Sequence, residues 1–82
     1  MGRGRFTLQV KADRDPAIID TFMKNLKQAG FHPHKIRVSL PGKGQFFRVR
    51  IGRFETMEEA RAFQRKYRAS SGQDDGGFVT RL

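Results

Sequence analysis

The segment HKIRVSLPGKGQFFRVRI, residues 34–51, contains two stretches of alternating polar and apolar residues joined by Pro41-Gly42-Lys43-Gly44. Alternation with a period of two is typical of half-buried β-strands, and a short Pro/Gly segment is typical of a tight turn. The segment therefore predicts a β-hairpin with strands over 34–40 and 45–51.

The residues on either side of the hairpin add two strands and two helices. Residues 5–11 alternate, and residues 16–29 carry apolar side chains at helical spacing behind Asp15, a predicted N-cap. After the hairpin, a Thr56-x-x-Glu59 capping box opens a second helix, and a polar loop over 70–77 precedes a short strand over 78–82.

We therefore expect a tail, residues 1–4, and one α+β domain, residues 5–82. Its order βαββαβ predicts a split sandwich of ferredoxin-like topology, in which two helices cover one face of a four-stranded antiparallel sheet.

Composition narrows the classes of function. The 82 residues carry a net charge of +9 and no Cys, which favours an anionic partner and excludes thiol-based metal sites. His32 and His34 bring no further metal ligands with them, so we expect no metal. The adjacent carboxylates Glu58-Glu59 and Asp74-Asp75 diverge, and Ser70-Ser71 lacks a placed base, so we also expect no cofactor and no catalysis. The apolar runs are too short to span a membrane, and the start MGRGR lacks the apolar stretch of a secretory signal, so export would need a segment upstream.

The sheet face that the helices leave open is the predicted binding surface. If apolar residues point to the core, the residues that face outward are polar and basic with one aromatic side chain: Thr7, Gln9, Lys11, Lys35, Arg37, Ser39, Phe46, Arg48 and Arg50. Like charges placed close together on a sheet are mildly destabilising, which favours a binding role over simple solvation. In the last strand the sequence leaves open whether Phe78 and Thr80 or Val79 and Arg81 face the ligand, and Val79 is included in the predicted site.

Nucleic acid is one candidate ligand for such a face. The RNA-recognition motif has the same topology and stacks bases on aromatic residues of its third strand, within the signature K/R-G-F/Y-G/A-F-V-x-F/Y. Here the segment KGQFFRVR, residues 43–50, begins in the same way but places Gln45 and Phe47 where the outward aromatic residues are required. Phe47 is in phase with the core residues Val49 and Ile51, so RNA or single-stranded nucleic acid is the alternative and not the first hypothesis.

The chain resembles the SPOR family over nearly its whole length. The similarity lies in the strand FTLQV (6–10), the helix start DPA (15–17), the helix exit LKQAGF (26–31), the segment LPGKGQFFRVRIGRF (40–54) and EEA (58–60). One departure is Ala12, which stands where the family often has a hydroxyl that contributes to the site.

The resemblance implies a non-catalytic module that binds peptidoglycan glycan strands lacking stem peptides, at septal or remodelled cell wall. It also implies a monomeric domain of a larger protein in the periplasm or cell envelope. Removal of the stem peptide exposes the lactyl carboxylate of muramic acid, which Arg can bind through bidentate hydrogen bonds. We therefore expect Arg37, Arg48 and Arg50 to bind carboxylates, Phe46 to pack on a sugar ring and Gln9 to bind acetamido or hydroxyl groups. The full predicted glycan site is Thr7, Gln9, Lys11, Arg37, Phe46, Arg48, Arg50 and Val79.

Overall fold

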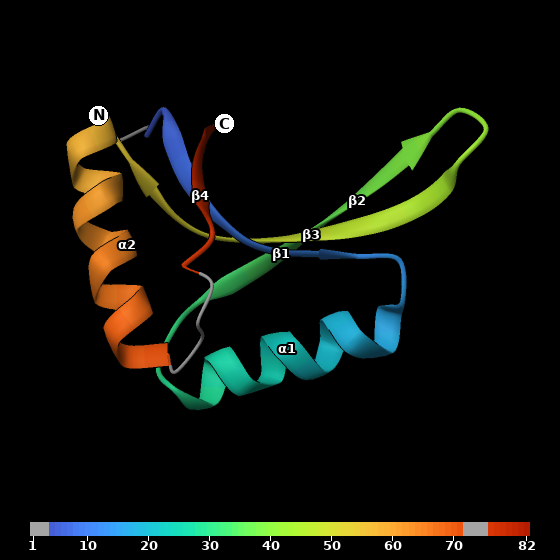
Figure 1. The fold of residues 1–82 in the computed structure, drawn as a ribbon, viewed down its shortest axis with the longest axis horizontal. Coiled ribbons are helices and arrows are strands. Elements are labelled where there is room, and N and C mark those ends of the chain that lie inside the picture. Colours follow the sequence, from blue (N-terminus) through green and yellow to red (C-terminus); the bar gives the residue numbers. More distant parts are fainter. Residues whose placement is uncertain (1–3, 72–75) are drawn as a thin grey trace.

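The computed structural model describes residues 4–71 and 76–82 and has the predicted order of elements (Figure 1). The elements are β1 (Phe6–Asp13), α1 (Pro16–Gln28), β2 (Pro33–Leu40), β3 (Gly44–Phe54), α2 (Met57–Ser71) and β4 (Phe78–Arg81). Ser70 and Ser71, predicted to begin a loop, instead end α2, and residues 72–75 of that loop lie outside the described part of the chain.

The four strands form one antiparallel sheet in the order β2-β3-β1-β4, and both helices lie on the same side of it (Figure 1). The α+β prediction is therefore confirmed. The core lies between the sheet and the helices, and its buried members are Leu8, Val10, Ile19, Leu26, Val49, Ile51 and Tyr67. Phe47 packs against this cluster, as its phase with Val49 predicts.

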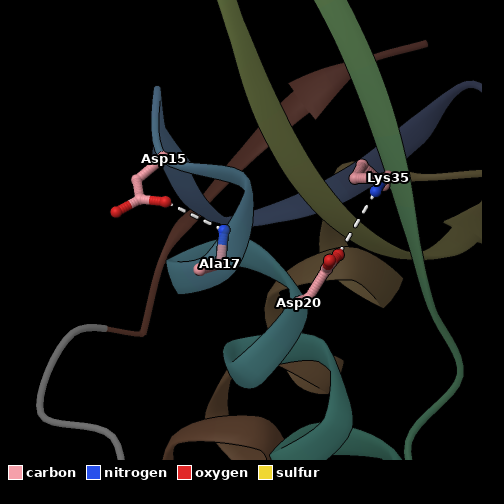
Figure 2. Close-up of polar contacts among 4 residues, drawn as sticks. All are labelled: Asp15, Ala17, Asp20 and Lys35. Carbon is pink, nitrogen blue, oxygen red and sulfur yellow. Dashed lines mark hydrogen bonds and ion pairs between the residues drawn. The ribbon is translucent and has the colours of Figure 1, made fainter.

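Local sequence signals account for the ends of both helices. The backbone N–H of Ala17 donates to the Asp15 carboxylate at 2.9 Å, so Asp15 caps α1 (Figure 2). The N–H of Glu59 donates to Thr56 Oγ1 at 3.1 Å, which is the main bond of the predicted capping box. These caps position α1 and α2 against the sheet and leave its other face without a covering element.

Two β-bulges shift the register between β1 and β3. Leu8 pairs with Ile51 but Phe6 pairs with Phe54, so β3 has one extra residue around Gly52, whose φ is +80°. Gln9 pairs with Arg50 but Lys11 pairs with Val49, so β1 has one extra residue at Val10. Because an extra residue reverses the alternation, the side chains of β1 on the two sides of Val10 do not follow one simple pattern.

Candidate functional site

A row of four side chains crosses the open face of the sheet, one from each strand. His34 on β2 pairs with Arg50 on β3, Arg50 pairs with Gln9 on β1, and Gln9 pairs with Phe78 on β4. Directly paired residues of antiparallel strands point to the same side. The core residues Val49 and Ile51 flank Arg50 and point toward the helices, so this row faces away from them.

The middle of the row is held by a hydrogen bond. Arg50 Nε donates to Gln9 Oε1 at 3.2 Å, and Gln9 is only 8% exposed. Burial, and after it the charge of Arg48, lowers the pKa of the Arg50 guanidinium, which nevertheless stays charged at neutral pH. This arrangement fixes one edge of a guanidinium and leaves its other N–H groups as donors for an anion.

A second group of side chains lies next to this row. The guanidinium of Arg48 sits over the ring of Phe46, 5.2 Å from the ring centre, and the pair shares the open face with Arg50. The β2 partners of Arg48 and Phe46 are Ile36 and Val38, both half-buried. Two cations therefore sit beside one aromatic ring and two aliphatic side chains, a combination suited to a ligand that is both anionic and ring-shaped.

Metal clusters and membrane-spanning helices are both absent from the part of the chain that the structure describes. Within that part, no cluster of three or more His, Cys, Asp or Glu side chains could hold a metal ion. None of the helices described is long and apolar enough to cross a membrane.

Comparison with known proteins gives the family. A model of the SPOR domain matches residues 2–81. This chain belongs to the SPOR family. SPOR domains are peptidoglycan-binding modules found in proteins of the bacterial cell envelope.

A solved structure agrees with this assignment. The chain is similar to "Spor protein DedD", with a TM-score of 0.68 and 18% sequence identity. The match covers 96% of this chain and 39% of that protein, so the SPOR domain described here spans well under half of the DedD chain in that structure. At this identity the likeness establishes the shared fold. Among curated proteins the search gives no match.

The predicted positions of the β2 side chains in this SPOR domain are wrong. Lys35 pairs with Val49 and Arg37 with Phe47, both of which face the core. Lys35 Nζ contacts Asp20 of α1 at 3.3 Å, on the helix side (Figure 2). Ser39, paired with Gln45, follows the same alternation at the exposed end of the hairpin. Ile36 and Val38, and not Lys35 and Arg37, lie on the open face.

Three further residues of the predicted glycan site are not available to a ligand on the open face: Lys11 and Val79 lie on the helix side, and Thr7, which pairs with Thr80 on the open side, is buried. Lys11 lies beyond the Val10 bulge and points to α1, with Nζ 5.6 Å from the ring centre of Phe22. Thr7 is fully buried, and its hydroxyl lies 2.6 Å from the Gly52 carbonyl oxygen, to which it donates. Val79 packs against the core. Of the two alternatives for β4, the structure therefore has Phe78 and Thr80 on the open face, the face that Gln9 occupies.

The prediction assigned three residues of β2, His34, Ile36 and Val38, to neither the open face nor the glycan site, although they lie on the open face. The register of the hairpin indicates the outward position of these β2 residues. The turn closes with Leu40 opposite Gly44, so every residue of β2 pairs with a β3 residue of the same parity. Since Phe46, Arg48 and Arg50 are even-numbered and face outward, the even-numbered residues of β2 must face outward too.

Proposed function

We propose that this SPOR domain binds peptidoglycan glycan strands that have lost their stem peptides, through the open face of its sheet. The observation that carries the proposal is the placement of the bonded Arg50–Gln9 pair beside the stacked Arg48–Phe46 pair. A strand without stem peptides carries a lactyl carboxylate on every second sugar, whereas an intact strand has each of these carboxylates in an amide. The two arginines therefore provide a physical basis for preferring the stripped strand.

Each side chain has a distinct role in this proposal. Arg48 and Arg50 bind carboxylates, and Phe46 packs against the apolar C–H face of a sugar ring together with Ile36 and Val38. Gln9 accepts a hydrogen bond from Arg50 through Oε1, so its amide N–H groups serve as donors to acetamido or hydroxyl oxygens. Lys11, Arg37 and Val79 are not part of it, because their side chains lie on the helix side.

The role of the domain in its parent protein is part of the same proposal. Binding without catalysis would deliver a larger envelope protein to septal or remodelled cell wall, where amidases remove stem peptides. Membership of the SPOR family supports the binding function, and the specificity for stripped strands rests on the arginines.

Nucleic acid remains the competing ligand. Its support is the net charge of +9 together with two aromatic residues, Phe46 and Phe78, on the open face. Against it, Phe47, at a position of the third strand where the RNA-recognition signature needs an outward aromatic residue, packs against the core.

Co-sedimentation with purified sacculi, before and after amidase treatment, tests the proposal. We expect retention to rise after treatment and to persist when RNA is added as competitor. Equal retention on both preparations would contradict the preference for stripped strands, and tight RNA binding without retention on sacculi would favour the competing ligand.

A matched pair of variants shows whether the open face is the surface that binds the glycan. Arg48→Ala should reduce retention on treated sacculi by about tenfold, since hydrogen bonds between charged groups contribute about 1.5–3 kcal/mol. Arg65→Ala removes the same charge from an exposed position on α2, which packs on the other side of the sheet, and should change retention by less than about twofold. Equal losses in both variants would indicate binding by net charge alone.

A further inference from the structure

His34 occupies the outer end of the row that crosses the open face. It lies on β2, an edge strand of the sheet, directly opposite Arg50, and its side chain is half-buried. The row continues through Arg50 to Gln9, two residues to which the proposed function gives contacts with the glycan. An anion bound at Arg50 would therefore lie within reach of the imidazole.

The surroundings of His34 disfavour its charged form while the face is empty. Burial lowers the pKa of the imidazole below its usual value, and the positive charges of Arg53 and then Arg50, both on β3, lower it further. The helices lie on the other side of the sheet, where Asp20 is engaged with Lys35. In the free domain at neutral pH the imidazole is thus neutral.

A carboxylate beside Arg50 would reverse this balance. The negative charge of the carboxylate offsets the positive charges of the arginines, and a carboxylate oxygen accepts a hydrogen bond from the protonated ring. Both effects favour the imidazolium. Protonation makes both ring nitrogens donors, whereas the neutral ring has one donor and one acceptor.

We propose that His34 is a further ligand-contacting residue of the SPOR domain, whose imidazolium binds the same carboxylate as Arg50, so that binding of an anionic glycan is coupled to uptake of one proton. This inference rests on the proposed function. It adds a contact that the sequence-based prediction did not include, and it makes recognition of the carboxylate dependent on pH.

The direction of the pH dependence follows from linkage. The pKa of His34 is lowered in the free domain and raised in the complex, so the complex carries more protons than the free domain between those two values. Affinity is highest below the pKa of the free state and falls as the pH rises through that of the complex. A difference of one unit between the two pKa values corresponds to a tenfold change in affinity.

The test measures the affinity of the 82-residue chain for a tetrasaccharide that contains muramic acid without stem peptides, between pH 5 and 8. We expect the affinity to be about tenfold higher at pH 5 than at pH 8. His34→Gln should abolish most of this dependence, whereas His32→Gln, an exposed position two residues away, should retain it. An oligomer of N-acetylglucosamine, which has no carboxylate, should bind without the His34-dependent change.

An NMR titration of the imidazole gives a second measurement that does not depend on a variant. The pKa of His34 should rise on addition of the muramic-acid tetrasaccharide. Binding of the tetrasaccharide with the same affinity at every pH, or an unchanged pKa of His34, would overturn this inference alone. Absence of binding at every pH would overturn the proposed function as well.

Discussion

Arg50 on β3 donates a hydrogen bond to Gln9 on β1 at 3.2 Å, which joins the two central strands across the open face. The bond orients a guanidinium that has no acidic neighbour in the four-residue row His34–Arg50–Gln9–Phe78. The state of Gln9 therefore decides whether Arg50 is available to a ligand anion.

Gln9→Glu should separate binding from stability. A carboxylate at position 9 would pair with Arg50 within the protein and repel the carboxylates of the glycan. We expect affinity for amidase-treated sacculi to fall by at least about tenfold, while the thermal midpoint stays equal or rises. Gln45→Glu is the control, because it makes the same charge change at an exposed position in the hairpin. A similar loss in both variants would show that position 9 has no specific role.

Phe46 and Phe47 are adjacent but lie on opposite faces of β3, which makes them a matched pair. Phe46→Ala should lower glycan affinity by about five- to tenfold, equivalent to about 1 kcal/mol of lost ring contact. Phe47→Ala should lower the free energy of unfolding by about 2–3 kcal/mol, because Phe47 packs against the core. Thermal unfolding and co-sedimentation measured on both variants check this, and a Phe46→Ala domain that unfolds would contradict the assignment of faces.

Lys35 and Arg37 test the register of β2 directly. Both point to the helix side, so Lys35→Ala and Arg37→Ala should each change glycan affinity by less than about twofold. Loss of the Lys35–Asp20 ion pair, which is exposed to solvent, should cost less than about 1 kcal/mol of stability. A tenfold loss of binding in either variant would place these cations on the ligand face after all.

Fold and site differ in how far the sequence predicts them. The order βαββαβ depends on signals within single segments, such as the Asp15 cap, the Thr56 capping box and the alternation in 45–51, and the structure has all of them. The faces of β1 and β2 depend instead on pairing between strands, which the bulges at Gly52 and Val10 and the hairpin turn determine.

The error on β2 has a clear physical origin. The rule that apolar residues face the core assumes a solvated open face, but here Ile36 and Val38 share that face with Phe46. The helix side at this end of the sheet instead accepts Lys35, which contacts Asp20 and lies over the ring of Phe47, 5.3 Å from its centre. The rule that apolar residues face the core and polar residues face solvent therefore fails on β2 for two reasons. The open face carries apolar side chains, and the helix face has a charged edge.

Gly77 controls how β4 joins the sheet beside Gln9. Its φ is +72°, and a Cβ atom added there would collide with the carbonyl oxygen of Gln9. The carbonyl of Gly77 also accepts a hydrogen bond from Gln64 Nε2 of α2 at 2.8 Å, so this residue links α2 to the entry of β4. Gly77→Ala should therefore combine backbone strain with displacement of β4 and of Phe78.

Gly42→Ala separates these two costs. Gly42 has a similar φ of +75°, but a Cβ atom there would meet nothing within 4 Å. Gly42→Ala should lower the free energy of unfolding by about 1 kcal/mol, from the left-handed conformation alone. Gly77→Ala should lower it by at least about 2–3 kcal/mol, a fall in thermal midpoint of roughly 8–24 °C for a domain of this size. It should also weaken glycan binding, because Gln9 lies against the displaced strand. Equal effects of the two substitutions in thermal unfolding would show that the collision with the Gln9 carbonyl adds nothing to the loss of stability.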